Sequence, residues 1–359
     1  MAGVIEAIGI ISGLLGIVQF GIDNFADPKT VGSTIRITVG LDTKGGLNNA
    51  GGDLPDVRLW NEAGDFLGIK ADPGKVEHGG FKDITINHKR DSTQQPTYTL
   101  FSANNDAICI AAASITWPNG DKYSWVGDWG RQCGASWYFS NVFISGTNVK
   151  PDCMWIDGNN DQPQTGFQIH WPEFVDRDGN QVPADEEGKL AKMDYLCTAG
   201  PPFKLHNFPD KDPRGITYWV INNNKKRSDS ADSDGEVDIA YGPAKHPSSA
   251  RFRNNLSSFA ARSNGTTNAW ANRLVLDNSA THPARALCES ETSAGPDFLN
   301  VEDGTFCRMS DKTLWAICGT PGADAANCFD KDAMRLVVGG LAARDSPYEN
   351  VVDWTAGAN

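Results

Sequence analysis

Residues 108–126, I-C-I-A-A-A-S-I-T-W-P-N-G-D-K-Y-S-W-V, are the stretch that decides the fold class. Two apolar runs flank Pro118, Asn119 and Gly120, which are residue types typical of a hairpin turn. We therefore predict two strands, over residues 108–117 and 123–126, that pair antiparallel.

Similar short runs lie on both sides of this hairpin, separated by Gly, Pro, Asn and Asp. The further predicted strands cover residues 35–39, 57–60, 84–86, 98–101, 137–144, 167–171, 217–221, 237–241 and 273–276. Because no helical pattern separates the runs up to residue 171, the chain is predicted to be mainly β, with a β-sandwich or jelly-roll-like domain. We place this domain at residues 26–175, a loop-rich β region at 176–285 and a Cys-containing C-terminal region at 286–359.

The first 25 residues are predicted to form an apolar helix. Val4, Ile8, Ile11, Leu15, Val18 and Ile22 recur at helical spacing, while Gly9, Gly13 and Gly16 cluster on another face. Such a helix must be buried in its own domain, in a second subunit or in a membrane surface. The glycines favour a subunit contact, because close helix packing offsets their cost in a helix. The predicted self-association residues are Ile8, Gly9, Ile11, Gly13, Leu15 and Gly16.

Targeting signals in this segment fit poorly. No Lys or Arg precedes Lys29, whereas a secretory signal begins with a cationic region and a spanning helix has basic flanks. We therefore expect the segment to be retained in the folded protein.

The chain is acidic, with 45 Asp and Glu against 32 Lys and Arg and a formal charge of -13. This charge repels phosphate backbones, so nucleic acid is not an expected partner. The eight cysteines contain no C-x-x-C pair, which argues against zinc and thioredoxin-type redox sites. Cys288, Cys307, Cys318 and Cys328 lie close together and are disulfide candidates, with buried free thiols as the alternative.

Two short runs resemble enzyme motifs but lack essential groups. Residues 132–140 resemble the active-site stretch of papain-type proteases, with Ser136 at the position of the nucleophilic Cys and no His at the expected separation. Glu236 and Asp238 resemble half of the carboxylate strand of laminarin-type glycosidases, with Tyr241 in place of the second Glu. We predict no catalytic residues.

Asp232, Asp234 and Asp238 form a weak candidate metal site. They resemble the centre of a calcium loop, but a calcium ion takes six to eight oxygen ligands, and turn chemistry explains the same residues. No cofactor is predicted.

Lys226 and Arg227 form a dibasic pair that a processing protease could cleave.

The C-terminal region resembles an uncharacterised protein family of filamentous fungi. The resemblance rests on Gly295 to Phe298, Phe306 and Cys307, Leu314 and Trp315, Cys318, and Cys328 to Asp330, together with a run at residues 49–68. It implies a fungal source and, for some members, secretion, and it brings no activity to carry over.

From these patterns we predict a non-enzymatic structural or interaction protein that self-associates, with the N-terminal helix at the subunit contact. The alternative is an extracellular glycan-binding module that uses exposed Trp and Tyr side chains. A hydrolase without a recognisable motif is third. Disulfide candidates favour an extracellular or cell-surface location over a cytoplasmic one, and membrane contact through the helix is a further alternative.

Overall fold

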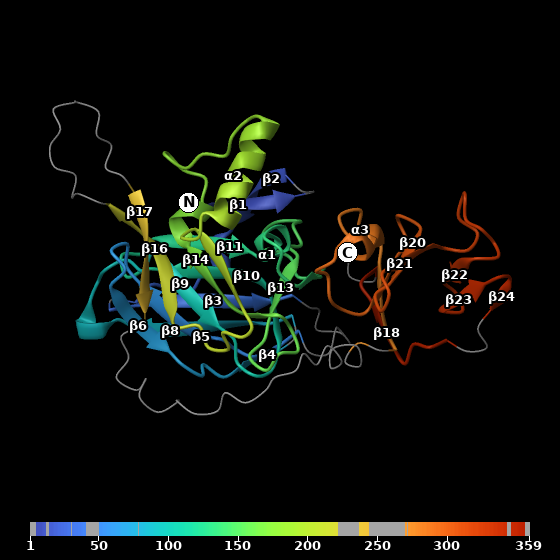
Figure 1. Ribbon diagram of the computed structural model, residues 1–359, viewed down its shortest axis with the longest axis horizontal. Coiled ribbons are helices and arrows are strands. Elements are labelled where there is room, and N and C mark those ends of the chain that lie inside the picture. The colour runs from blue at the N-terminus through green and yellow to red at the C-terminus, as the bar shows by residue number, and fades with distance from the viewer. Residues whose placement is uncertain are drawn as a thin grey trace.

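A computed structural model describes residues 5–11, 14–29, 31–40, 50–77, 79–221, 237–243, 270, 272–342 and 346–355. The protein is mainly β, and most of its strands belong to two antiparallel sheets that form a two-sheet body and to a third sheet in a C-terminal unit, residues 272–355 (Figure 1). Three α-helices are present in the described part of the chain, α1 (Asp128–Gln132), α2 (Glu186–Thr198) and α3 (Ala284–Glu289).

The first sheet is centred on the strand that the opening hairpin predicts. Its order is β12 (Trp137–Tyr138), β13 (Cys153–Ile156), β10 (Ile108–Thr116), β3 (Gly32–Val39) and β8 (Phe81–Asn87), and β11 (Lys122–Val126) also pairs with β10. The register Thr116↔Lys122 confirms the hairpin around Pro118 to Gly120.

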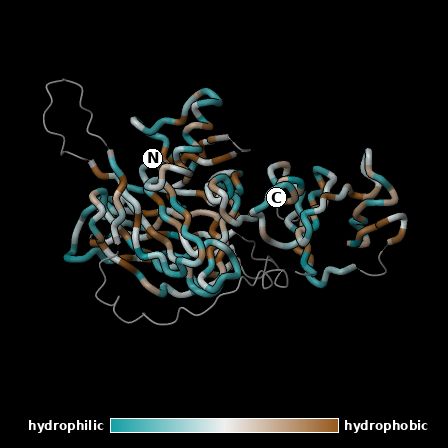
Figure 2. Tube along the Cα trace, viewed as in Figure 1, coloured by the Kyte–Doolittle hydropathy of each residue, from teal (hydrophilic) through white to brown (hydrophobic). Residues whose placement is uncertain are grey.

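The second sheet is also antiparallel. Its order is β15 (Phe203–Asn207), β14 (Gln164–His170), β9 (Tyr98–Ser102), β5 (Asp56–Trp60) and β6 (Phe66–Lys70). Side chains from both sheets, such as Ile37 and Ile110 from one and Phe101 and Phe167 from the other, belong to one hydrophobic core. Figure 2 shows hydrophobic and hydrophilic residues interspersed along the chain of this body. Burial alternates along the second half of β8, as expected for a strand that buries one face, whereas every residue of β9, β10 and β14 is buried.

Several smaller elements surround the body. They are the hairpin β16 (Gly215–Ile221) and β17 (Val237–Pro243), the pair β4 (Gly52–Asp53) and β7 (Lys75–Val76), and the 3-10 turns η1 (Ile22–Asn24), η2 (Lys89–Asp91) and η3 (Trp171–Phe174). Among the described helices, none is long and apolar enough to cross a membrane.

The C-terminal unit has its own mixed sheet. Its order is β21 (Thr313–Ala316), β20 (Thr305–Arg308), β19 (Asp297–Asn300), β18 (Arg273–Asp277) and β25 (Asn350–Asp353), with β18 parallel to both neighbours. A three-stranded sheet, β22 (Cys328–Asp330), β23 (Arg335–Val338) and β24 (Leu341–Ala342), follows at the end of the molecule (Figure 1).

These pairings bear on the predicted domain boundaries. The boundary at 175/176 separates β14 from its partner β15, and the boundary at 285/286 separates β18 from β19. Of the strand predicted over residues 137–144, only Trp137 and Tyr138 are extended in a ladder.

The predicted N-terminal helix is wrong, because this segment forms a β-hairpin. Strands β1 (Ile5–Ile11) and β2 (Leu14–Phe20) pair antiparallel with Ile8 opposite Ile17 and Gly9 opposite Gly16. The Ser12-Gly13 dipeptide between them favours a turn. The many Ile, Val and Gly residues are also poorer helix formers than Ala or Leu, and the β-branched ones fit a strand better.

The hairpin packs on the body of the same chain. Ile8 and Leu15 are buried in the main core, the Trp129 indole donates a 3.0 Å hydrogen bond to the Ile8 carbonyl, and Ala7 bridges to Val175. A Cβ atom at Gly9 would overlap the Val18 side chain, so the glycine serves close packing within the chain. Of the other predicted self-association residues, Gly16 is half-buried, Ile11 lies in β1 and Gly13 lies outside the described residues.

All eight cysteines form disulfides, so the free-thiol alternative is wrong. The four C-terminal candidates pair as Cys288–Cys307 and Cys318–Cys328, and the body contains Cys109–Cys153 and Cys133–Cys197. Four disulfides are typical of proteins that fold in an oxidising, extracellular or secretory environment.

Replacing Ile8 by alanine is expected to lower the free energy of unfolding by about 2–5 kcal/mol, because it leaves a cavity in the core. Ile17 on the facing strand is 44% exposed, so the same change there should cost less than about 0.5 kcal/mol. Urea unfolding followed by Trp fluorescence measures both values. Similar small losses in the two variants would contradict the burial of Ile8 within its own chain.

Candidate functional site

Three consecutive aromatic residues join the C-terminal unit to the body. Trp137, Tyr138 and Phe139 are fully buried in a second core, in which they meet Phe298 and Trp354 of the C-terminal unit. Phe139 and Phe298 lie 5.3 Å apart between ring centroids, and the Tyr138–Phe298 and Phe298–Trp354 pairs pack edge to face. This aromatic cluster fixes the two units against each other.

Strand β13 has apolar residues on both faces because each face packs in a different core. Met154 and Ile156 of β13 point into the main core, whereas Cys153 and Trp155 belong to the second core. Alternation along a strand sends neighbours to opposite faces, so a continuously apolar strand has both faces covered. The Cys109–Cys153 disulfide links β10 to β13 within the second core.

Residues 292–296 run along the body beside β12. The Trp137 amide donates to the Thr292 carbonyl at 3.3 Å, and the Ala294 amide donates to the Trp137 carbonyl at 2.9 Å. The Trp155 indole donates to the Ala294 carbonyl at 2.9 Å, and the Tyr138 hydroxyl donates to the Pro296 carbonyl at 3.0 Å. Both side chains and backbone therefore hold this segment in place.

Lys312 holds the same segment from the other side. Its ammonium donates to the Ser293 carbonyl at 2.6 Å and also contacts the Ser293 hydroxyl. Burial lowers the pKa of Lys312 to about 8. The Ser293 hydroxyl itself donates to the Leu287 carbonyl at 2.6 Å, at the end of α3. We interpret the Ser293–Lys312 pair as a structural tie, because the hydroxyl is directed to a backbone acceptor.

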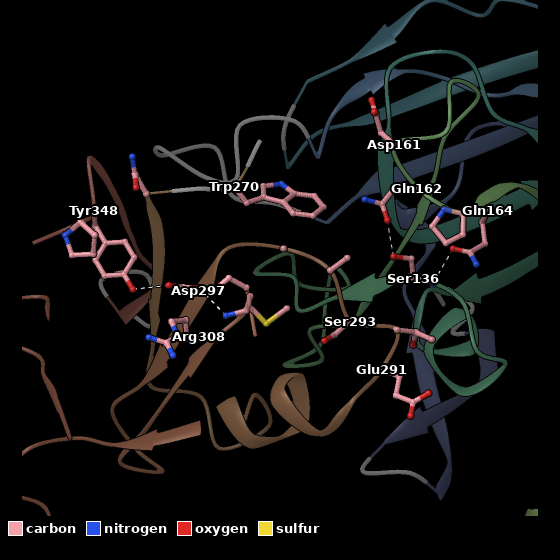
Figure 3. A pocket seen from close by; sticks show the side chains of 18 of the residues that line it. Ser136, Asp161, Gln162, Gln164, Trp270, Glu291, Ser293, Asp297, Arg308 and Tyr348 are labelled. Atoms are coloured by element: carbon pink, nitrogen blue, oxygen red, sulfur yellow. Dashed lines mark hydrogen bonds between the residues drawn. The ribbon is translucent and has the colours of Figure 1, made fainter. Parts of the chain in front are cut away.

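A cleft of about 860 Å³ opens at this junction (Figure 3). We call it the junction cleft. Its body wall consists of Gly134, Ser136, Asp161, Gln162, Pro163 and Gln164. Its C-terminal wall consists of Trp270, Asn272, Glu291 to Gly295, Asp297, Arg308 to Ser310, Leu336, Pro347 and Tyr348.

Two buried glutamines organise the body wall. Gln162 accepts a 2.6 Å hydrogen bond from the Ser136 hydroxyl, and Gln164 accepts a 2.9 Å bond from the Ser136 amide (Figure 3). Each amide oxygen is therefore used, whereas no hydrogen bond from either amide nitrogen is found within the described part of the chain. These two nitrogens are donors that a ligand can use.

On the opposite wall, Asp297 is held by two donors. The Tyr348 hydroxyl donates to Asp297 Oδ2 at 2.6 Å, and the Met309 amide donates to Oδ1 at 2.7 Å (Figure 3). Burial raises the pKa of Asp297, although both hydrogen bonds oppose this effect. Arg308 makes a two-pronged ion pair with Asp311, at 2.9 and 2.6 Å.

The charge of the cleft is negative. Asp161, Glu291 and Asp297 line it, and among the described residues that line the cleft Arg308 is the only Lys or Arg. Because Arg308 is already paired with Asp311, its charge is largely neutralised by its own partner. The cleft is therefore a poor site for an anionic ligand.

Two aromatic side chains add flat apolar surface. Trp270 and Tyr348 are both half-buried lining residues. The Trp270 ring contacts the Trp155 ring, with the two ring centroids 5.5 Å apart. In Figure 3, Trp270 lies between Gln162 on the body wall and Tyr348 on the C-terminal wall. Its indole nitrogen has no hydrogen-bond partner among the residues described.

The residues that the sequence singled out lie elsewhere, with one exception. Ser136 lines the junction cleft, but its hydroxyl donates to an amide oxygen, which is not a base that could activate it. Asp238 is exposed on β17, and Asp232 and Asp234 lie outside the described residues, as do Lys226, Arg227 and Glu236. Within the described ranges, no group of three His, Cys, Asp or Glu side chains could hold a metal ion.

Sequence reasoning missed the cleft itself. Its walls come from segments that are distant in the chain, and Gln162, Gln164 and Tyr348 belong to no motif. The density of Trp residues near Trp137 and Trp155 was the one usable signal. Comparison with known proteins adds no assignment, because no family model and no curated protein matches the chain.

Replacing Tyr348 by phenylalanine is expected to raise the pKa of Asp297 further, because it removes the donor to Oδ2. The variant should also lose about 1–2 kcal/mol of unfolding free energy. Carbon-detected NMR titration of the Asp297 carboxyl measures the pKa. Tyr241→Phe, at an exposed tyrosine, is the control and should leave it unchanged; an unaltered Asp297 titration in Tyr348→Phe would refute the contact.

Proposed function

We propose that the protein is an extracellular saccharide-binding protein and that the junction cleft holds the sugar. The observation that carries this proposal is the combination, in one cleft, of aromatic Trp270 and Tyr348 with amide donors from Gln162 and Gln164. Sugar rings present apolar C–H faces that stack on aromatic rings, and their hydroxyls bond to amides and carboxylates. A volume of about 860 Å³ suits a short oligosaccharide.

The charge of the cleft supports a preference among saccharides. Three lining carboxylates and a paired Arg308 favour neutral or amine-bearing sugars over uronic acids and sulfated chains. We propose binding without hydrolysis, since Asp297 already accepts two hydrogen bonds and Ser136 faces an amide. We also propose that the two sheets with their shared core form the predicted β-sandwich.

Trp270→Ala is expected to weaken saccharide binding by about tenfold or more, the loss of roughly 1.4 kcal/mol of stacking. Calorimetric titration with cellohexaose, a chitosan hexamer and a galacturonic acid hexamer measures the affinity and the predicted charge preference. Trp219→Ala is the matched control, because Trp219 stacks on Tyr195 outside the cleft. Equal weakening by both variants, or preferential binding of the galacturonic acid hexamer, would overturn the proposal.

Self-association is a second candidate function, although its predicted helix is replaced by a hairpin. The observation that favours it is the exposure of two large apolar side chains in the N-terminal segment, Ile17 at 44% and Ile22 at 45%. A second copy that covered them would remove this apolar surface from water.

Membership of the fungal family stays a prediction.

Ile17→Asp is expected to convert a dimer into a monomer, because a charge in the contact must be desolvated. Sedimentation of the wild type and the variant at about 100 µM, well above a micromolar Kd, measures the mass. Asp23→Asn serves as the control, because it changes a residue next to Ile22 but leaves both exposed isoleucines in place. A wild-type protein that is monomeric at this concentration would exclude this candidate.

A further inference from the structure

A second cavity, of about 520 Å³, lies in the body and shares no lining residue with the junction cleft. We call it the histidine pocket. It is formed where the loop after β5, the end of β10 and the segment after β14 meet, and Glu62, Trp117, His170, Glu173 and Arg177 line it.

The charged centre of this pocket is an imidazole between two carboxylates. His170 Nε2 lies 2.9 Å from Glu62 Oε2, and Nδ1 lies 3.6 Å from Glu173 Oε1. His170 is 5% exposed, and its ring stacks on Tyr98 with the ring centroids 4.2 Å apart. Burial opposes the charged form of His170, but the two carboxylates outweigh it, so the pKa of His170 is raised. Burial likewise opposes ionisation of both glutamates, yet His170 holds the pKa of each below its usual value.

A buried donor in the same pocket lacks a partner. The Trp117 side chain is 2% exposed, and its indole nitrogen makes no hydrogen bond within the described part of the chain. An unpaired buried N–H costs about 1–3 kcal/mol, so a ligand that accepts from the Trp117 indole would recover part of this cost. The Trp117 ring packs on Tyr123 at 4.3 Å, and the Arg177 guanidinium donates to the Tyr123 hydroxyl at 3.1 Å. Trp117 and Arg177 both line the pocket, and both carry N–H donors.

We propose that the histidine pocket binds a small primary amine that carries a hydrogen-bond acceptor close to its ammonium group, as amino sugars and amino acids do. The ammonium group bonds to Glu62 and Glu173. His170 contacts both carboxylates, and Glu173 Oε1 also accepts from the Tyr195 hydroxyl at 3.0 Å. Because a carboxylate has about four acceptor sites, each glutamate still has acceptor sites for the ammonium group. The neighbouring hydroxyl or carboxylate oxygen accepts from the Trp117 indole and the Arg177 guanidinium.

Charge and size agree with this ligand class. The pocket is lined by three acidic residues, Glu62, Glu173 and Asp178, and by two basic ones, His170 and Arg177. The lining therefore carries an excess negative charge even when the imidazole is protonated. A volume of about 520 Å³ accommodates one monosaccharide or amino acid. The proposal stands independently of the junction cleft, since it uses none of that site's residues.

The test is NMR titration of the full-length protein with D-glucosamine, glycine and, as amine-blocked counterparts, N-acetylglucosamine and N-acetylglycine. We expect at least one free amine to bind about tenfold more tightly than its blocked counterpart, with the shifts confined to the histidine pocket. Glu62 is 58% exposed, so Glu62→Gln should fold normally and weaken that binding about tenfold. Equal affinity for free and blocked amines, or undiminished binding by Glu62→Gln, would overturn the proposal.

Trp117→Phe keeps an aromatic ring and removes only the indole N–H and part of the ring area. It should weaken binding of the same amine, whereas Trp354→Phe, which removes an equally buried unpaired indole in the C-terminal unit, should not. If Trp117→Phe fails to fold, the Glu62→Gln result decides alone. Trp270→Ala should leave amine binding intact, so failure of the saccharide site and failure of the histidine pocket are distinguishable.

Discussion

Burial of Trp137, Tyr138 and Phe139 between the body and the C-terminal unit is the constraint on which the rest of the structure depends. These side chains occupy the second core together with Phe298 and Trp354. Without that core, Cys153 and Trp155 on the outer face of β13 would be exposed to water. The cluster therefore covers the outer face of β13 and, by the same contacts, attaches the C-terminal unit to the body.

The junction cleft is a consequence of this docking. One wall is built by Gln162 and Gln164 of the body, and the other by Asp297 and Tyr348 of the C-terminal unit, so neither unit contains the site alone. Residues 292–296, tied to Trp137, Trp155 and Lys312, set how far apart the walls lie. The walls of the cleft are therefore held by the buried aromatic contacts together with these hydrogen bonds.

The sequence predicted the parts of the fold that rest on local pattern. The hairpin around Pro118 to Gly120 and strands such as β3, β5 and β9 follow from alternation and turn residues. The prediction for the N-terminal segment is wrong because apolar residues spaced for one helix face also fall in both strands of a hairpin. Strand β1 is buried on both faces, as Ala7 and Ile8 show, so its sequence lacks the alternation that marks a strand. The cleft could not be predicted, because it depends on contacts between segments far apart in the chain, which no local period encodes.

Scanning calorimetry of the full chain tests the central claim most directly. If the shared aromatic cluster joins the body and the C-terminal unit into one cooperative structure, the protein unfolds in a single transition whose calorimetric and van't Hoff enthalpies agree. Two resolved transitions, one for each unit, would contradict the account.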